Sequence, residues 1–220
     1  MKLHIYLFRH GQTTFNRDRR FTGWLNPPLT KRGVQDAKKI ARKLKSKRID
    51  VAFQSHTRRS KDTLKEVLRY HPECKAIIEN DLMIERSYGK LQGKTHTAFV
   101  KQEGTEDYKT LLHWHKIDHL SGKAKKEFIR HVGEAELQIV RRSYNTPPPG
   151  GESLKMVEAR VNKFLKMLIP FMKKNKVNVA ISAHGNSMRP FRRHFEKFSK
   201  DEMMKLENPW DDYFDYAINV

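Results

Sequence analysis

The chain has 220 residues, enough for one α/β domain or two small ones with a substantial hydrophobic core. Hydrophobic residues make up 37% of it and charged residues 32%, and no run of about 18 apolar residues occurs, so we expect no membrane-spanning helix. The formal net charge of +20 predicts a positive field that attracts anions such as nucleic acids, acidic membranes or phosphorylated small molecules.

The N-terminal segment and the cysteine content predict a cytoplasmic protein. The apolar stretch after Lys2 is short, is broken by His4 and lacks a small-residue cleavage site, unlike a secretory signal peptide. Cys74 is the only cysteine, and we interpret it as a reduced structural thiol.

In chain order, strand patterns and helix patterns alternate. The predicted elements are a strand at 3–8, a helix at 34–44, a strand at 50–55, a helix at 59–70, a strand at 75–79, a helical region at 94–142, a loop at 146–153, a helix from there to about 174, a strand at 177–182, a helix at 191–198 and a C-terminal strand. Such alternation is typical of a parallel sheet with helices on both faces. We therefore predict a single domain, residues 1–220, of the α/β class. Its fold would be three-layer α/β/α, with a mostly parallel central sheet and a helical insertion at about 94–142.

Arginine and histidine side chains follow three of the predicted strands. Arg9 and His10 end the first strand, Arg59 follows the second, and His184 ends the strand at 177–182. In open α/β sheets ligands bind beyond the carboxyl ends of the strands, so these four side chains should meet at one edge. Guanidinium groups pair bidentately with phosphate oxygens. No carboxylate or metal-spaced histidine pair accompanies them, so we predict an oxyanion site and no metal.

The chemistry that fits this set is phosphoryl transfer to a histidine. A neutral imidazole attacks phosphorus, and fixed cations stabilise the charge on the equatorial oxygens. We expect one histidine to be the nucleophile and the other, protonated, to stabilise the same oxygens. The leaving oxygen needs a proton, and Glu85 is the best candidate for the acid. His113, His115 and His119 have helical spacing, and we interpret them as surface or packed histidines of the insertion rather than metal ligands.

Six motifs span the chain from end to end. They are RHGQTTFN (9–16), FTGWLNPPLTKRG (21–33), SHTRRSKDT (55–63), IERSYGKLQG (84–93), RRSYNTPPPGGESL (141–154) and AHGNS (183–187). Together they resemble the histidine phosphatase superfamily and, within it, the cofactor-dependent phosphoglycerate mutases. RHG and AHGNS are typical of the superfamily, whereas FTGW, ERSYG and the RRSY segment with its prolines are similar to the mutase branch.

The resemblance implies a role for each motif. His10 would carry the phosphoryl group, Arg9, Arg59 and His184 would hold it, and Glu85 would serve as acid and base. The residues that would bind the substrate or orient the phosphohistidine are Thr13, Asn16, Thr22, Gly23, Tyr88, Arg141, Arg142, Gly185 and Asn186. The implied activity is the interconversion of 3-phosphoglycerate and 2-phosphoglycerate in glycolysis and gluconeogenesis. It would be primed by 2,3-bisphosphoglycerate as phosphate donor and would use no metal.

The chain departs from the mutase pattern at three places. Mutases carry a substrate-binding lysine after LQG, and here Lys94, His96 or Lys125 could take its place. The segment PGGESL is compact, as in many superfamily phosphatases. The last predicted strand reaches Val220 without the tail that covers the mutase site, and water would then reach the phosphohistidine. The alternative function is therefore a phosphomonoesterase that hydrolyses small phosphorylated metabolites.

A third hypothesis is a nucleic-acid-binding protein on a catalytically inactive scaffold, suggested by the net charge. Against it, every residue that the chemistry needs is present. We therefore expect a small phosphorylated substrate and neither a membrane partner nor a specific nucleic-acid partner. A homodimer is possible, and residues 94–122 could act as a lid or as an interface.

Overall fold

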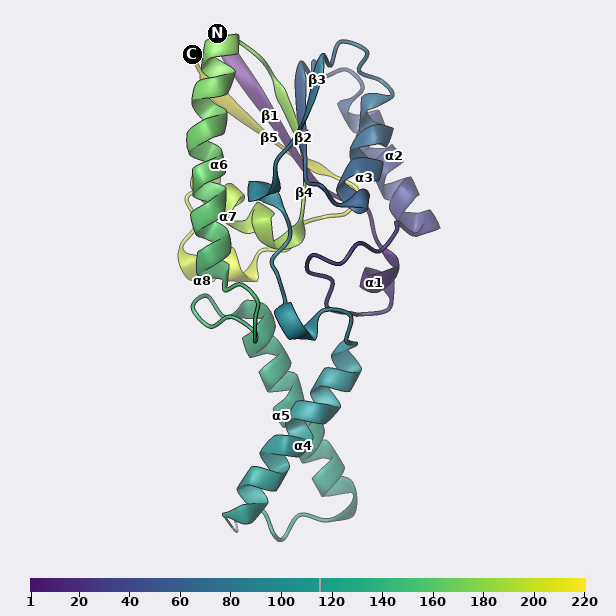
Figure 1. Ribbon diagram of the computed structural model, residues 1–220, viewed down its shortest axis with the longest axis vertical. Coiled ribbons are helices and arrows are strands. Elements are labelled where there is room, and N and C mark those ends of the chain that lie inside the picture. The colour runs from purple at the N-terminus through teal and green to yellow at the C-terminus, as the bar shows by residue number, and fades with distance from the viewer. Residues whose placement is uncertain (115) are drawn as a thin grey trace.

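A five-stranded sheet forms the centre of the computed structural model, which describes residues 1–114 and 116–220 (Figure 1). The strand order is β3-β2-β4-β1-β5. The strands are β1 (Lys2–Arg9), β2 (Val51–Gln54), β3 (Ala76–Glu79), β4 (Val179–Ala183) and β5 (Tyr213–Asn219). Neighbouring strands are parallel except β5, which runs antiparallel to β1. The prediction of a mostly parallel sheet is confirmed.

Helices cover both faces of this sheet. One face packs against α2 (Lys31–Leu44) and α3 (Arg58–Leu68), and the other packs against α6 (Leu154–Asn175) and α7 (Gly185–Glu196). Successive side chains of a strand point to opposite faces, so β1 contributes to both cores. Tyr6 and Phe8 join the core under α2 and α3, whereas Ile5 and Leu7 join the core under α6 and α7. The predicted three-layer fold is thus confirmed.

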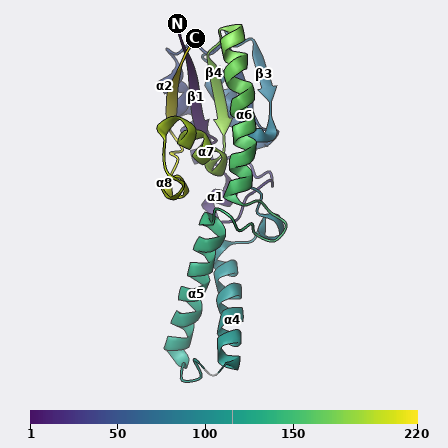
Figure 2. The ribbon, with the colours of Figure 1, turned by 90° about the vertical axis from the view of Figure 1, so that its left-hand side faces the viewer.

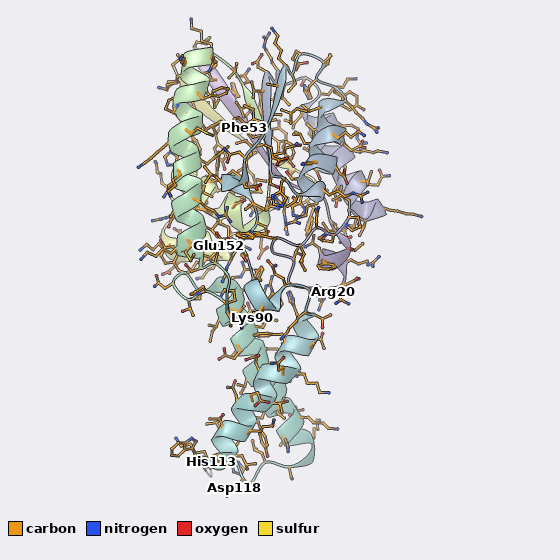
Figure 3. All side chains as sticks on the ribbon, viewed as in Figure 1. Arg20, Phe53, Lys90, His113, Asp118 and Glu152 are labelled. Carbon is orange, nitrogen blue, oxygen red and sulfur yellow. The ribbon has the colours of Figure 1, made fainter. Side chains whose placement is uncertain are left out.

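The predicted helical region at 94–142 forms a two-helix arm that projects beyond the carboxyl ends of the parallel strands (Figures 1 and 2). It consists of α4 (His96–His113) and α5 (Gly122–Arg142). The far end of the arm, near His113 and Asp118, lies away from the sheet (Figure 3), and His115 lies outside the described residues. The tip of the arm therefore does not cover the edge of the sheet where the strands end.

Glycines allow the two arm helices to cross closely. A Cβ on Gly104 would lie 1.9 Å from the carbonyl oxygen of Ile129, and a Cβ on Gly133 would lie 2.0 Å from that of Val100. Because both contacts are with backbone atoms, neither position admits a side chain without separating the helices.

Helix α7 begins earlier than the sequence pattern predicts, at Gly185 rather than at residue 191. The backbone N–H of His184 donates to Ser187 Oγ (3.3 Å), a capping contact that starts the helix directly after β4. The helix ends at Glu196 because Lys197 adopts a left-handed conformation, with φ of 61°. The elements α1 (Thr14–Arg17), η1 (Asp81–Met83), η2 (Gly89–Leu91) and α8 (Lys200–Lys205) were not predicted, since they are too short to show a periodicity.

Among the described residues, no helix is both long and apolar enough to traverse a bilayer. Helix α6 has 22 residues and buries an apolar row that includes Val157, Val161 and Leu168. On its exposed side it carries charged side chains, all of which are lysines.

Candidate active site

Strand ends and one helix start bring the four predicted phosphate-binding side chains together. Arg9 ends β1 and His10 follows it, while His184 follows the neighbouring strand β4. Arg59 lies in the first turn of α3, which follows β2. The rings of His10 and His184 are buried, with their centroids 4.9 Å apart. The carboxyl edge of the sheet thus holds two imidazoles and two guanidinium groups.

A close backbone contact fixes the loop after His10. A Cβ on Gly11 would lie 2.1 Å from the carbonyl oxygen of Gly33 in the first turn of α2, so only glycine fits there. The backbone N–H of Gly11 donates to Thr63 Oγ1 of α3 (3.0 Å). Contacts with two helices therefore hold His10 in place.

The surroundings of His10 keep its imidazole neutral and select one tautomer. Its Nδ1 lies 2.8 Å from the carbonyl oxygen of Gly11, which can only accept, so Nδ1 carries the proton. Nε2 then keeps its lone pair. Burial, and next the charges of Arg59 and Arg9, hold the pKa of His10 well below its usual value. Attack on phosphorus needs such a neutral imidazole.

His184 is also neutral in the surroundings that the protein provides. Its Nε2 lies 2.8 Å from Ser55 Oγ, and its Nδ1 is buried without a hydrogen-bond partner in the described part of the chain. Burial, followed by the charges of Arg59 and His10, holds its pKa well below the usual value. The expected protonated state is therefore not a property of the protein alone, since it requires an added negative charge.

Arg59 is a buried cation and Arg9 a partly buried one, and both have unused donors. Arg59 donates to the carbonyl oxygens of Leu25 (2.7 Å) and Gly23 (2.8 Å), and Arg9 lies 3.8 Å from the centroid of the Trp210 ring. The Nε atom of each arginine is buried without a partner among the described residues. Burial lowers the pKa of Arg59 to about 10, so the group stays charged at neutral pH. Two such cations are suited to an oxyanion.

Glu85 reaches both histidines from the loop between η1 and η2. Its Oε1 accepts hydrogen bonds from the backbone N–H groups of Arg86 (2.8 Å) and Asn186 (3.1 Å). One side-chain N or O atom from each of Glu85, His10 and His184 lies within 4.8 Å of those of the other two. A metal could be held at this spacing, but the two guanidinium groups of Arg9 and Arg59 beside it oppose a further cation. We interpret the cluster as acid–base groups around an anion site.

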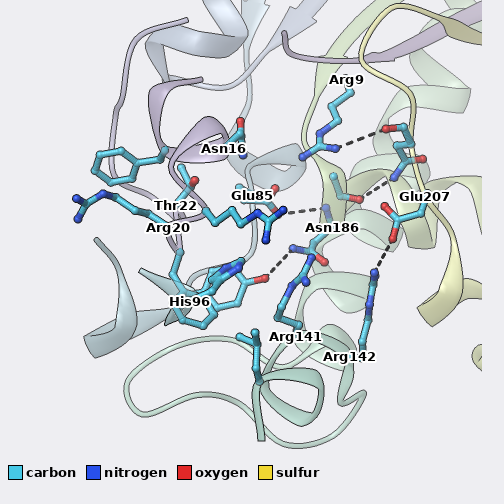
Figure 4. A pocket seen from close by; sticks show the side chains of 18 of the residues that line it. Arg9, Asn16, Arg20, Thr22, Glu85, His96, Arg141, Arg142, Asn186 and Glu207 are labelled. Carbon is cyan, nitrogen blue, oxygen red and sulfur yellow. Dashed lines mark hydrogen bonds and ion pairs between the residues drawn. The ribbon is translucent and has the colours of Figure 1, made fainter. Parts of the chain in front are cut away.

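A cavity of about 630 Å³ extends from this cluster to the base of the arm (Figure 4). On the arm side it is walled by Val100 of α4 and by Leu137 and Arg141 of α5. The predicted substrate-binding residues that line it are Asn16, Thr22, Gly23, Tyr88, Arg141, Arg142, Gly185 and Asn186.

Known proteins match the chain over nearly its whole length. The model of the histidine phosphatase superfamily (branch 1) matches residues 5–123 and 112–211. The chain belongs to the histidine phosphatase superfamily. It is 32% identical to the 2,3-bisphosphoglycerate-dependent phosphoglycerate mutase of Pseudoalteromonas atlantica, over 92% of this chain and 88% of the relative. It is 35% identical to the protein of the same name from Chlamydia caviae, over 93% of this chain and 89% of the relative.

Solved structures of superfamily members share the fold. A mycobacterial glucosyl-3-phosphoglycerate phosphatase matches with a TM-score of 0.70 at 20% identity, over 99% of this chain and 91% of that one. A phosphoglycerate mutase from Bacillus anthracis matches with a TM-score of 0.65 at 18% identity, over 99% and 92%. The fold is thus common to phosphatases and mutases.

Thr13, which was predicted to contact the substrate or the phosphohistidine, does not line the cavity in the described structure. It is the N-cap of α1 and is fully buried. Its hydroxyl donates to Asn16 Oδ1 (2.8 Å) and accepts from the backbone N–H of Asn16 (3.2 Å). Thr13 therefore orients Asn16, whose side chain lines the cavity, instead of facing a substrate.

The two neighbouring arginines at the end of α5 differ in their partners. Arg142 donates to Glu207 Oε1 (2.5 Å) and to the carbonyl oxygen of Met204 (3.2 Å). In the described residues no ion pair involves Arg141, which also lines the cavity. Arg141 is therefore the more available of the two for an anionic ligand.

Lys94, His96 and Lys125 were the candidates to replace the substrate-binding lysine of the mutases. Of these three, His96 is the one that lines the cavity in the described structure. Lys94 Nζ lies 3.4 Å from Gln102 Oε1, and Lys125 Nζ lies over the ring of Tyr108 at 4.4 Å, so both point elsewhere.

His96 does not supply the positive charge of a lysine. Its ring packs against Phe21, with the centroids 4.6 Å apart. Burial, then the charges of Arg141 and Arg19, lower the pKa of His96 to about 4, so the imidazole is neutral at pH 7.

Sequence reasoning missed the segment before β5. The carbonyl oxygen of Asn208 accepts from Arg9 (3.5 Å), and its Nδ2 donates to the carbonyl oxygen of Gly185 (2.9 Å). Trp210 stacks on Arg9. Asparagine and tryptophan just before a strand were the available signal, but only the pairing of β5 with β1 places them at the site. Other cavity-lining residues that no motif contains are Arg19, Arg20, Thr97, Val100, Arg130, Glu134, Leu137, Arg189 and Glu207.

Proposed function

We propose that the protein is a phosphoglycerate mutase that interconverts 3-phosphoglycerate and 2-phosphoglycerate and is primed by 2,3-bisphosphoglycerate. The observation that carries the proposal is a second cationic group in the cavity, Arg141, apart from the Arg9 and Arg59 pair. A phosphoglycerate has two anionic groups, a phosphate and a carboxylate. Relatives that are 32% and 35% identical carry the mutase name, which supports the same assignment.

In the first half-reaction, His10 takes a phosphoryl group from the bisphosphate. Nε2 attacks phosphorus, so that an N–P bond forms while the bond from phosphorus to a glycerate oxygen breaks. The unused Nε donors of Arg9 and Arg59 stabilise the charge on the equatorial oxygens. Glu85 supplies the proton that the leaving oxygen needs.

In the second half-reaction, the phosphoryl group returns to the other hydroxyl of the glycerate. Glu85, now a carboxylate, accepts the proton of the attacking hydroxyl. The negative charge of the phosphoryl group favours a proton on His184 Nδ1, which otherwise lacks a partner. Arg141 binds the carboxylate beside Tyr88 and Asn186, whose side chains lie 3.4 Å apart from Oη to Nδ2. This activity belongs to glycolysis and gluconeogenesis, in the cytoplasm.

The second candidate is a phosphomonoesterase that uses the same residues with water as the acceptor. A cavity of about 630 Å³ has the size of sites that hold considerably larger ligands than a three-carbon acid. The remaining space admits water to a phosphorylated His10, and closure against water is what separates a transferase from a hydrolase.

A coupled assay tests both candidates. Purified protein receives 3-phosphoglycerate in chelator, with and without catalytic 2,3-bisphosphoglycerate, and both 2-phosphoglycerate and free phosphate are followed. Isomer that depends on the bisphosphate, with little phosphate release, is the expected result. Phosphate without isomer would replace the mutase by the phosphatase, and neither product, with His10→Ala indistinguishable from wild type, would remove both.

A further inference from the structure

Helix α6 presents a row of lysines to solvent. Its exposed charged residues are Lys155, Lys163, Lys166, Lys173 and Lys174. The other charged side chains of α6 do not reach the same surface as free charges. Glu158 is buried, and Arg160 is paired with Glu152 at 2.9 Å. We call the five lysines the α6 face.

The α6 face carries no counter-charge, in contrast to the other basic helices. In α2, which is also rich in lysine, Lys39 pairs with Asp211 and Lys43 with Asp212, both at 3.0 Å. Within the described residues, the lysines found in ion pairs are Lys39, Lys43, Lys47, Lys61, Lys109 and Lys123. None of them lies on α6. In the described part of the chain, the exposed lysines of α6 therefore have no carboxylate partner, whereas α2, α3, α4 and α5 each pair some of their lysines.

Two carboxylates near the start of α6, Glu152 and Glu158, already have hydrogen-bond or ion-pair partners. Glu152 binds Arg160, and Glu158 accepts from Tyr144 (2.5 Å) and forms an ion pair with Arg193. They therefore cannot neutralise the lysines without breaking these contacts.

Three of the five lysines form a straight stripe along α6, and apolar side chains lie beside it. At about 100° per residue, Lys155, Lys166 and Lys173 fall within about 20° of one another on the helix surface. From Lys155 to Lys173 the stripe is about 27 Å long. Met156 and Met167 lie on the same side of the helix and are 50% and 41% exposed. The face therefore combines long cationic side chains with flexible apolar ones.

A groove beside the stripe offers further polar groups. It lies between α6 and α7, has a volume of about 350 Å³ and is lined by Asn162 of α6, by His194 of α7 and by Lys197 directly after α7, together with the ion pair of Glu158 and Arg193. A small anionic group bound next to the stripe would find further donors there.

We propose that the α6 face docks the protein onto the surface of an anionic lipid bilayer. A row of lysines is attracted to a negatively charged surface, and exposed methionines between the charges can enter the headgroup layer. A nucleic acid fits this face less well, because the face has no arginine to fork onto bases and no aromatic ring to stack on them. The proposal departs from the expectation of no membrane partner, which rested on the lack of a spanning segment. Surface docking needs none.

Docking through α6 would leave the cavity accessible. The helix lies along one flank of the sheet, whereas the cavity lies at the carboxyl edge next to the arm (Figure 1). The proposal therefore does not depend on the proposed mutase function, and vesicle binding and turnover can be measured separately.

Vesicle co-sedimentation of the full chain tests the proposal. The probes are phosphatidylcholine vesicles with and without about a third phosphatidylserine, in about 0.1 M salt. Wild type is expected to bind the anionic vesicles and not the neutral ones. Replacing Lys163, Lys166 and Lys173 together by glutamine should lower the partition coefficient about 100-fold, because each lysine near an anionic surface contributes about 1 kcal/mol. Turnover of this variant should equal that of wild type, which shows that it is folded.

A control variant removes the same charge from another helix. Replacing Lys39, Arg42 and Lys43 of α2 by glutamine should weaken vesicle binding only a few-fold, through the loss of net charge. Met167→Gln alone should weaken vesicle binding as well, which a purely electrostatic contact would not show. An equal loss in the α2 and α6 variants, or no binding by wild type, would overturn the proposal. So would binding to duplex DNA that depends on the α6 lysines without any binding to vesicles, because the face would then serve nucleic acid.

Discussion

Burial and two neighbouring arginines together keep the histidines of the site neutral. Burial first, and then charges that include those of Arg59 and Arg9, lower the pKa of both His10 and His184, so the site presents imidazole lone pairs and guanidinium charges side by side at neutral pH. The cations that would bind phosphate thus also help to keep His10 unprotonated. A proton on His184 then depends on the arrival of the anion, which couples binding to activation.

Glu85→Gln tests the acid–base role. The amide can still accept the backbone N–H bonds of Arg86 and Asn186, so the fold should persist, but it cannot donate a proton to the leaving oxygen. We expect kcat to fall by about 10²- to 10⁴-fold in the coupled mutase assay. Glu134→Gln is the matched control, because Glu134 also lines the cavity but pairs with Arg130. Equal losses in the two variants would contradict the assignment.

His96 should make the protein less stable in mild acid. Unfolded, its imidazole binds a proton near pH 6.5, but in the folded chain it does so only near pH 4. Between these values the unfolded state holds more protons, so the free energy of unfolding falls as the pH is lowered from 6.5 toward 4. Urea unfolding at pH 7.5 and 4.5 should show a smaller loss in His96→Gln than in wild type. His10 and His184 also have lowered pKa values, but both are present in wild type and in the variant. An identical loss of stability in the two proteins would therefore exclude this role of His96.

Residues next to one another in a motif could be predicted from the sequence, and isolated ones could not. Arg9, His10, Arg59, Glu85 and His184 each follow or approach a predicted strand end, and the α/β rule places such positions at one edge. Trp210, Arg19 and Arg189 sit in no motif, and their place in the cavity depends on how β5, α1 and α7 pack. Thr13 was assigned to the substrate because it belongs to a motif, whereas its contacts make it a helix cap.

The arm is the element whose form depends most on single positions. Gly104 and Gly133 let α4 and α5 cross at backbone contact, and toward the sheet Val100 and Leu137 wall the cavity. The angle between these helices therefore shapes the ligand site. Hydrophobic periodicity predicted helices here, but it could not predict the crossing, which depends on the absence of two side chains.

Gly104→Ala should loosen the arm and leave the sheet intact. Its methyl would lie 1.9 Å from the carbonyl oxygen of Ile129, so the helices must separate, at a cost of about 1 to 3 kcal/mol. Native-state hydrogen exchange should become faster in α4 and α5 and stay unchanged in β1 and β4. The KM for phosphoglycerate should rise as the cavity wall shifts. Gln138→Ala, an exposed change on α5, should alter neither quantity, and unchanged exchange in Gly104→Ala would refute the role of the crossing.

The whole molecule carries a net charge of +20, and its cavity is lined by several arginines. Such a field speeds the encounter with anionic substrates, and salt screens it. The layers of the fold follow from apolar periodicity alone, but the location of unbalanced charge follows only from the ion pairs, which sequence does not reveal.

Substrate capture should therefore depend on ionic strength. Between about 0.05 and 0.5 M potassium chloride we expect kcat/KM for phosphoglycerate to fall about tenfold, with kcat nearly constant, because Arg59 and the Nε atom of Arg9 are buried and are screened little. Steady-state kinetics across this range provides the measurement. A kcat/KM that does not change with salt would show that the surface charge takes no part in capture.

The order of the strands also governs how a newly made chain assembles. β1 leaves the ribosome first, but both of its neighbours come late, β4 from residue 179 and β5 from residue 213. At typical synthesis rates β1 waits roughly 10 to 40 s for them. During that time β1 and β2 have to stay apart, because β4, which lies between them in the finished sheet, has not yet been synthesised. His10, which follows β1 and is the proposed nucleophile, thus gains its surroundings only when translation is nearly complete.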